Sequence, residues 1–303
     1  MVDMAVDLVF HSAGRQFTAP CAGNSQAMSS GRAVISRASR ENFPVASRVL
    51  PGRYRGHLFA VYAFARHVDD IGDEAGREDR PRLLDDVDAD LRRLYAGRAP
   101  RHPVVRGLRL TVRECAVPAE PFHLLVEAGR RDQRVTRYET FDELLGYCAL
   151  SANPVGHIVL HVFGAAGGAR VPLSDRVCSA LQVIEHCQDV GEDYRRGRVY
   201  LPGEDLRRYG CTEHDLAGVV TPKPLRRVVA LQAGRAARLL DAGAPLLASL
   251  SGFARAAVAG YVAGGRATVA ALERSGHDVL GVAVRPGRAR LGGAWLRALV
   301  TGR

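Results

Sequence analysis

The stretch VYAFARHVDDIGDE, residues 61–74, decides how the rest of this sequence is interpreted. Together with Leu58, its apolar residues follow the i, i+3, i+4, i+7 spacing of one helix face. Asp69 and Asp73 stand four residues apart, so they lie about one turn apart and continue the apolar stripe. Carboxylates on a buried stripe need a partner, because an unpaired buried charge is costly. Alone, the stretch leaves two interpretations open: a solvated or ion-paired helix face, and a metal site.

A second stretch, LQVIEHCQDVGEDYRRGRVYLP at residues 181–202, carries a similar pattern. Helical spacing puts four of its polar residues on one face: Gln182, Glu185, Asp189 and Asp193. The adjacent apolar stripe consists of Val183, Cys187 and Val190. If the two helices face each other in a bundle, two pairs of aspartates converge, and their like charges repel without a cation between them. Oxygen ligands of this kind suit Mg²⁺, which completes its coordination with water and phosphate.

Arginines flank both acidic stretches: Arg66, Arg195, Arg196 and Arg198. A guanidinium group binds phosphate oxygens in a bidentate manner, so we expect a diphosphate substrate. Metal-assisted departure of diphosphate is then the expected reaction type, and it leaves a carbocation that needs a dry cavity lined by aromatic rings. The candidates for that lining are Phe43, Tyr62, Phe64, Tyr147 and Tyr200. Glu74, Glu192, Arg195 and Arg196 are interpreted as solvated groups.

Helical periodicity dominates the chain from residue 53 onward, whereas strand alternation is scarce. After the opening helix, the patterns cover Arg82–Tyr95, Val104–Cys115, Pro121–Gln133, Phe141–Ala152, Pro154–Phe163, Ser174–Tyr194, Leu225–Ser249 and Phe253–Ser275. The pieces between them carry Gly and Pro breakers. We therefore expect an all-α fold of about ten helices in one domain. Its expected limits are a flexible extension at 1–32, the helical domain at 33–295 and a tail at 296–303.

Two glycine-rich pieces were candidates for nucleotide-binding loops: GAAGGA at 164–169 and GYVAGGRA at 260–267. Neither has the spacing of a dinucleotide or P-loop fingerprint, and neither lies between a strand and a helix. We interpret the first as a loop and the second as a site of close helix packing. A bound nicotinamide dinucleotide is therefore not expected.

The composition is that of a globular protein: 303 residues, 47% hydrophobic and 24% charged. No apolar run has the length of a membrane-spanning helix, and the N-terminus lacks the pattern of a signal peptide. The six cysteines are scattered without a CxxC pair, which predicts reduced thiols. The net charge of +10 comes almost entirely from arginine, with no basic cluster interleaved with aromatics, so no nucleic-acid partner is expected. We expect a cytoplasmic protein, with peripheral contact at the inner face of a membrane as a further option.

At these residues the sequence resembles the squalene/phytoene synthase family, the head-to-head prenyl synthases. The family motif Y-A-F-x-R-x-x-D-D-x-x-D is complete from Tyr62 to Asp73, and QDVGEDYRRGRVYLP resembles the second motif. Between them, RRDQRVTRYETFDELLGYCALSANPVG resembles the D-x(4)-RY-x-T segment. The likeness covers roughly residues 36–290. It implies an isoprenoid-synthase-type helical bundle with a central cavity and a prenyl diphosphate substrate.

Within the family, ENFPVAS (41–47), SANPVG (151–156) and QDV in the second motif resemble the hopanoid-pathway branch. The resemblance implies conversion of presqualene diphosphate to hydroxysqualene, with water capturing the cation and no NAD(P)H. The other hypotheses are head-to-head condensation of two farnesyl or geranylgeranyl diphosphates to presqualene diphosphate, squalene, dehydrosqualene or phytoene, and a non-enzymatic basic helical module.

The resemblance also assigns roles to individual residues. About two or three Mg²⁺ ions would be bound with the substrate by Asp69, Asp73, Asp189 and Asp193, supported by Asp70. Arg66 and Arg198 would hold diphosphate with Tyr200 nearby. The prenyl cavity would be lined by Phe43, Tyr62, Tyr147, Gln182 and Glu185. Three residues depart from the family pattern: Glu185 stands in place of Asn, Gln188 in place of Arg and His277 in place of Tyr.

Overall fold

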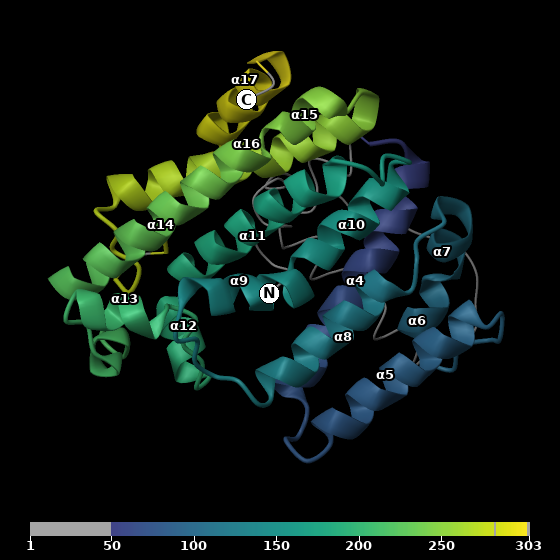
Figure 1. Ribbon diagram of the computed structural model, residues 1–303, viewed down its shortest axis with the longest axis horizontal. Helices are drawn as coiled ribbons and strands as arrows, with labels where there is room; N and C mark the ends of the chain where they lie inside the picture. Colours follow the sequence, from purple (N-terminus) through teal and green to yellow (C-terminus); the bar gives the residue numbers. More distant parts are fainter. Residues whose placement is uncertain (1–49, 282, 302–303) are drawn as a thin grey trace.

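The computed structural model describes residues 50–281 and 283–301, which form helices joined by short loops (Figure 1). The helices, labelled as in Figure 1, are α4 (Gly52–Glu74), α5 (Arg80–Tyr95), α6 (Pro103–Gly107), α7 (Arg109–Cys115), α8 (Glu120–Asp132), α9 (Phe141–Ser151), α10 (Asn153–Val162), α11 (Arg170–Gln188), α12 (Val190–Arg195), α13 (Gly203–Arg208), the 3₁₀ turn η1 (Glu213–Leu216), α14 (Lys223–Gly243), α15 (Pro245–Ser249), α16 (Gly252–Arg274) and α17 (Arg288–Thr301). The β pairing among the described residues is one isolated bridge between Arg137 and Val199. The predicted all-α fold is confirmed.

The bundle has two sides that meet along α10 and α11 (Figure 1). On one side α4, α5, α6 and α8 enclose an apolar cluster in which Phe64 and Phe122 pack edge to face at 5.2 Å. On the other side α11 packs against α14, α14 against α16, and α16 against α17. The amphipathic helices bury their apolar faces in these two clusters, which fixes the position of α4 relative to α11.

Local sequence explains where several helices begin. A proline occupies the first turn of α5, α8, α10 and α14, where its missing N–H costs nothing. At the start of α9, the Thr140 hydroxyl accepts from the Glu143 backbone N–H, and the Glu143 carboxylate accepts from the Glu139 N–H. Such caps satisfy N–H groups that the helix itself leaves unpaired.

Three patterns predicted as single helices are each divided in two. The 104–115 pattern divides at Leu108, after Gly107, and the 225–249 pattern divides at Ala244, before Pro245. Gly is a weak helix former, and Pro disfavours helical backbone in the residue before it. The 174–194 pattern divides at Asp189, whose φ of −101° and ψ of 14° leave the helical range. Because the Asp193 N–H still donates to the Asp189 carbonyl at 2.8 Å, this last division is a kink.

The predicted tail from residue 296 is helical as far as Thr301, because those residues are the last turns of α17. The indole N–H of Trp295 donates to the Ala256 carbonyl at 2.9 Å, which attaches α17 to α16. The three divisions, together with α13 and α17, bring the nine predicted patterns to the fourteen α-helices that lie within the described residues.

The two glycine-rich pieces have the predicted roles. Gly164, Gly167 and Gly168 have positive φ angles in the loop before α11. In α16, a Cβ on Gly265 would lie 2.9 Å from both Leu181 and Leu240, so the missing side chain lets three helices approach closely. Neither piece belongs to a nucleotide-binding turn.

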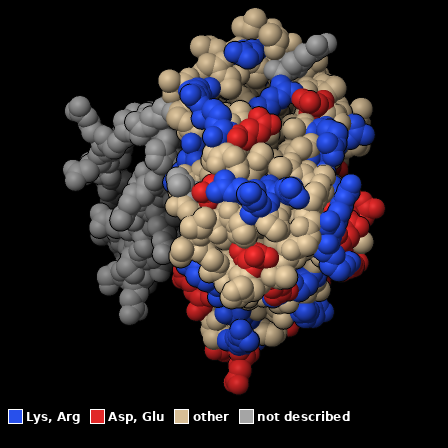
Figure 2. All heavy atoms as spheres, turned by 90° about the vertical axis from the view of Figure 1, so that its left-hand side faces the viewer, with Lys and Arg blue, Asp and Glu red and all other residues tan. Residues whose placement is uncertain are grey.

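The remaining predictions from the sequence concern membrane spans, cysteines, surface charge and the N-terminal residues, and the structure describes the first three. Across residues 50–281 and 283–301, none of the helices is both long and apolar enough to cross a bilayer. The described cysteines form no disulfide, as predicted. Figure 2 shows basic and acidic side chains interspersed on one face of the molecule rather than gathered into a single-sign patch. The predicted extension at 1–32 and the candidate Phe43 lie outside the described residues.

Candidate functional site

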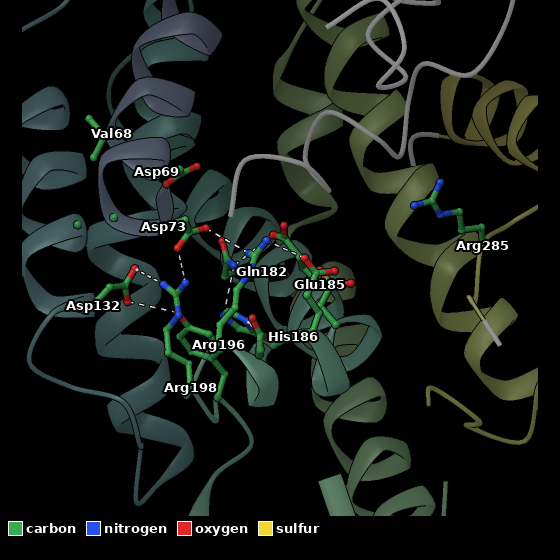
Figure 3. Close-up of a pocket in the computed structure, with 16 residues that line it drawn as sticks. Val68, Asp69, Asp73, Asp132, Gln182, Glu185, His186, Arg196, Arg198 and Arg285 are labelled. Carbon is green, nitrogen blue, oxygen red and sulfur yellow. Dashed lines mark hydrogen bonds and ion pairs between the residues drawn. The ribbon is translucent and has the colours of Figure 1, made fainter. Parts of the chain in front are cut away.

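A pocket of about 160 Å³ opens between the last turns of α4 and the junction of α11 with α12 (Figure 3). Seven of its lining residues are acidic: Asp69, Asp73, Asp132, Glu185, Asp189, Glu192 and Asp193. Three are arginines: Arg196, Arg198 and Arg285. A cavity with this lining is suited to a polyanion accompanied by cations rather than to an apolar ligand alone.

The first wall of the pocket is the C-terminal half of α4. Asp69 and Asp73 project from it one turn apart, as the i, i+4 spacing predicts. The carboxylate of Asp73 pairs with the guanidinium of Arg198 and, at 3.2 Å, with that of Arg196. Because both arginines follow α12, these ion pairs connect the first wall to the second.

The second wall is the end of α11, where the side chains of Gln182, Glu185 and His186 are buried. The Gln182 amide donates to Glu185 Oε2 at 3.2 Å and lies 3.2 Å from His186 Nε2. His186 Nδ1 lies 3.7 Å from the carboxylate of Asp193. Burial lowers the pKa of His186, although Asp193 opposes that shift. The imidazole is therefore held largely neutral near pH 7.

The floor of the pocket is a hydrogen-bonded cluster around Asp132, at the end of α8. Tyr147 donates to Asp132 Oδ2 at 2.9 Å, Tyr200 donates to Oδ1 at 3.3 Å, and Arg198 lies 3.6 Å from Oδ2. Burial raises the pKa of Asp132 to about 7, a shift that Arg198 and the two hydroxyls reduce. Burial also acts to lower the pKa of Arg198, but Tyr200, Asp73 and Asp132 outweigh it, so this pKa is raised. Arg198 is thus a permanent cation paired with a carboxylate of the first wall, Asp73, and with that of the floor, Asp132.

Aromatic rings lie directly beneath these polar groups. His186 stacks on Tyr200 with ring centroids 3.8 Å apart, and Tyr147 stacks on Tyr200 at 5.4 Å. Burial raises the pKa values of Tyr147 and Tyr200 well above the usual range, so both remain neutral phenols. Neutral aromatic faces attract a cation that lies over them.

The donor set of the pocket fits Mg²⁺ chemically. All the candidate ligands are carboxylate oxygens, which are the ligands that Mg²⁺ prefers, and Mg²⁺ typically takes only one or two carboxylates before water and phosphate complete its octahedron. Within the described part of the chain, no three His, Cys, Asp or Glu side chains are grouped closely enough to hold one ion by themselves. Asp69 on the first wall and Asp189 and Asp193 on the second are the residues that would hold it.

The structure brings most of the sequence-predicted residues to this pocket. Its lining includes Asp69, Asp73, Gln182, Glu185, Asp189, Asp193, Arg198 and Tyr200. Tyr147 lies just beneath the lining, bonded to Asp132.

Several predicted residues lie elsewhere. Arg66 and Asp70 do not line the pocket; the Arg66 guanidinium pairs with Asp70 at 2.9 Å along α4, so that interaction is local to the helix. Tyr62 and Phe64 are buried in the apolar cluster beneath α4. Arg196 and Glu192 are exposed, as interpreted from the sequence, but both also line the pocket, where Arg196 bonds Asp73. Glu74 is exposed, as predicted.

Three residues that line the pocket were not among the site residues predicted from the sequence: Asp132, His186 and Arg285. Asp132 lies in the segment RRDQRVTRYET, whose resemblance to the family pattern was the signal that could have found it. His186 follows Glu185 directly, and only the three-dimensional packing places its ring on Tyr200. Arg285 follows α16 far along the chain, and Figure 3 shows it set apart from the other labelled groups.

Comparisons of the sequence with known proteins give matches to one family. The family model described as squalene/phytoene synthase matches residues 36–294. The hydroxysqualene synthase of Zymomonas mobilis is 38% identical over 205 residues, covering 66% of this chain and 67% of its own length. That of Rhodopseudomonas palustris is 37% identical over 216 residues, covering 70% and 72%.

Solved structures agree as well. The squalene synthase HpnC from Alicyclobacillus acidocaldarius has a TM-score of 0.74 and 41% identity, covering 82% of this chain and 94% of its own. A dehydrosqualene synthase in complex with a ligand has a TM-score of 0.79 over 90% of this chain and 95% of its own; at 24% identity it supports the fold alone.

Proposed function

The chain belongs to the squalene/phytoene synthase family of prenyl diphosphate transferases, and from this premise we propose that it converts presqualene diphosphate to hydroxysqualene with the help of Mg²⁺. This proposal is carried by the convergence on one pocket, above the Tyr200–His186 stack, of Asp69 from α4, Asp189 from the junction of α11 with α12, and Arg198 from the segment after α12. Two relatives named hydroxysqualene synthase, at 38% and 37% identity, support the choice of product.

The proposed reaction balances without a reductant. The carbon–oxygen bond to diphosphate breaks, and the leaving diphosphate takes the electron pair. The remaining cation rearranges and bonds to the oxygen of a water molecule, which then loses a proton. The overall change is presqualene diphosphate plus water to hydroxysqualene plus diphosphate and a proton, so no NAD(P)H is needed.

Each part of the pocket has a separate task in this proposal. Bound Mg²⁺ would neutralise the charge that develops on the departing diphosphate. Arg198 and Arg196 would bind phosphate oxygens from the other side, and their ion pairs with Asp73 hold both guanidinium groups at the pocket before substrate arrives. The neutral ring of Tyr200 would face the cation, with an attraction of about 0.5–2 kcal/mol for a favourably placed ring, and the neutral His186 beside it adds no opposing charge.

The test uses purified protein with presqualene diphosphate and Mg²⁺ in ¹⁸O-labelled water. We expect release of inorganic diphosphate and a hydroxylated C30 lipid that carries the heavy oxygen, detected by mass spectrometry. Loss of both signals after chelation of the metal would support the Mg²⁺ requirement. A C30 product without the heavy oxygen, or no product, would contradict water capture.

The Asp69→Asn variant is the key control, because it removes one charge at the pocket while preserving shape. Its matched control is Glu74→Gln, which makes the same chemical change one turn further along α4 at an exposed position outside the lining. We expect the first variant to lose diphosphate release and the second to keep it. Equal activity in both would contradict a role for the pocket.

A second function is head-to-head condensation of two farnesyl or geranylgeranyl diphosphates. It is favoured by the squalene synthase structure at 41% identity and by phytoene synthases such as that of Mycobacterium tuberculosis, 33% identical over 177 residues. Incubation with farnesyl diphosphate alone separates the two functions. Efficient coupling of that substrate would favour condensation over hydroxylation.

A further inference from the structure

Helix α17 is attached to the bundle by one face only. Its inner face packs on the core through Ala294, Trp295 and Ala298, and Ala298 is buried. Two hydrogen bonds fix it in place: Trp295 Nε1 donates to the Ala256 carbonyl, and Arg255 donates to the Leu299 carbonyl, each at 2.9 Å. Figure 1 shows α17 at the edge of the molecule, on the outer side of α16. Its opposite face therefore points away from the protein core.

The outward face of α17 is apolar. Ala289, Gly293, Leu296 and Val300 follow each other at intervals of four, three and four residues, so they form one stripe. Leu296 keeps 60% and Val300 keeps 83% of its surface exposed. Such large exposed fractions on two aliphatic residues of one stripe are unfavourable in water, and a partner that covers them would gain their burial.

A row of positive charge runs along the same helix. Arg290 and Arg297, seven residues apart, lie beside the stripe and are exposed. Neither forms an ion pair with the residues that the structure describes at 50–281 and 283–301. Residues 279–303 as a whole contain five arginines and no Asp or Glu. The apolar stripe is thus paired with a cationic edge that no local carboxylate neutralises.

We propose that α17 docks the protein on an anionic lipid surface, with Leu296 and Val300 entering the boundary of the acyl chains and Arg290 and Arg297 contacting lipid phosphates. An amphipathic helix with arginines beside its apolar face is the arrangement that lies in the plane of a bilayer interface. The stems of the arginines can remain among the lipids while their guanidinium groups reach the headgroups. This surface is separate from the pocket, so the inference goes beyond the proposed function.

Other occupants fit the helix less well. A second copy of the chain docked through the same stripe would bring the arginine rows of two identical helices close together, and like charges at an interface are unfavourable. A nucleic acid would contact the arginines but would leave Leu296 and Val300 in water. An anionic bilayer uses both features of the face at once.

The experiment measures co-sedimentation of the full chain with vesicles of phosphatidylcholine alone and with vesicles in which roughly a quarter is phosphatidylglycerol. We expect binding only to the anionic vesicles, weakening as salt screens the charges. Leu296→Asp with Val300→Asp should lower the partition coefficient roughly tenfold or more by removing apolar insertion and adding repulsion. Arg290→Gln with Arg297→Gln should lower it on the order of tenfold.

The matched control is Val219→Asp with Val220→Asp, which makes the same kind of change at two valines that are 82% and 67% exposed in the loop before α14. It should bind vesicles like the unmodified protein. All variants alter exposed side chains, and unchanged thermal melting verifies that each is folded.

Three outcomes would overturn the proposal. They are equal binding to neutral and anionic vesicles, undiminished binding by the α17 variants, and an equal loss of binding in the Val219 and Val220 control. Gel filtration and a DNA-binding assay cover the other occupants. Self-association or DNA binding that the α17 variants abolish, without vesicle binding, would assign the face to a second copy or to a nucleic acid instead.

Discussion

The wall of the pocket formed by α4 differs from the wall formed by α11 and α12, although each contributes aspartates four residues apart. In α4 the helix is continuous through Asp69 and Asp73, and Asp73 is bonded to arginines from the opposite wall. In the second wall a kink at Asp189 separates two helices, and the neighbouring polar side chains are buried and bonded to one another.

This difference teaches that equal spacing in the sequence does not give equal surroundings. Asp73 is neutralised by Arg196 and Arg198 before any ligand binds, whereas Asp193 faces a buried, largely neutral histidine. Negative charge is therefore less compensated on the second wall, around Asp193, than on the first wall, around Asp73. We expect the two walls to share the requirement for their aspartates but to differ in the effects of substituting the residues around those aspartates.

The largest effect is expected from neutralising one aspartate on each wall. Asp69→Asn and Asp189→Asn should each lower the rate of diphosphate release by about 1,000-fold or more, because each removes a proposed oxygen ligand for the metal. The measurement is diphosphate release at saturating Mg²⁺. Retained turnover in both variants would contradict the two-wall arrangement, and loss in only one would assign the metal to that wall.

A smaller effect is expected from the two arginines that connect the walls. Arg198 is mostly buried, with 14% of its side chain exposed, whereas Arg196 is 48% exposed and also pairs with Glu192 at 2.8 Å. Arg198→Gln should lower kcat/KM about 100-fold and Arg196→Gln only about tenfold, because a desolvated guanidinium binds phosphate more strongly. Steady-state kinetics on the two variants make the comparison. Equal losses would show that burial of Arg198 adds nothing to phosphate binding.

Substitution of Asp132, which lies beneath the junction of the walls, should lower activity but raise stability at neutral pH. Asp132→Asn should lower kcat/KM roughly tenfold, because Arg198, Tyr147 and Tyr200 lose part of their common partner. Burial raises the pKa of Asp132 from 3.8 to about 7, so the folded state keeps a proton that the unfolded state has released. This carboxyl therefore costs stability as pH rises from about 4 to about 7, and the cost persists above that range.

Thermal melting across pH tests that sign. The melting temperature of Asp132→Asn minus that of the unmodified protein should increase from about pH 4 to about pH 7 and then level off. A flat difference would mean that Asp132 is ionised in the folded protein throughout the range. A difference that decreases with pH would mean that its ion pair with Arg198 outweighs burial.

The sequence was sufficient to predict the helical fold, because the 3.6-residue periodicity of apolar residues is a property of the local chain. It did not predict the breaks at Leu108, Asp189 and Ala244, since a periodic pattern can continue across a kink without losing its phase. The helix α17 was missed for another reason: it contains the pair Gly292 and Gly293, and glycine is a weak helix former in the local sequence.

The positions of the acidic residues of the site were predicted from the sequence, but their partners were not. The spacing of the acids identified both walls, because i, i+4 positions share a face whatever the tertiary structure. The partners of the acids could not be predicted in the same way. Arg66 lay near the acids in sequence but pairs with Asp70 along its own helix, whereas Arg196 reaches Asp73 across 123 positions of the chain. Which guanidinium meets which carboxylate depends on tertiary packing.

The smallest effect is expected from the glycine that each wall places near the pocket. A Cβ on Gly72 of α4 would lie 3.4 Å from the flexible amide end of Gln133, so Gly72→Ala should gain helix propensity, about 1 kcal/mol, with little strain. A Cβ on Gly191 of α12 would lie 2.9 Å from Cδ2 of Leu280, so this side chain must move. The same gain is offset there, because overpacking of a filled interior costs on the order of 1–3 kcal/mol.

The melting temperatures of these two variants should therefore differ by roughly 2–4 °C or more, with Gly72→Ala the more stable. Gly191 lies between Asp189 and Asp193, which both line the pocket. Displacement of the chain at Gly191 would move these two carboxylates, so Gly191→Ala should also raise KM. If both variants melt alike, Leu280 yields freely, and the kink at Asp189 does not depend on close packing at Gly191.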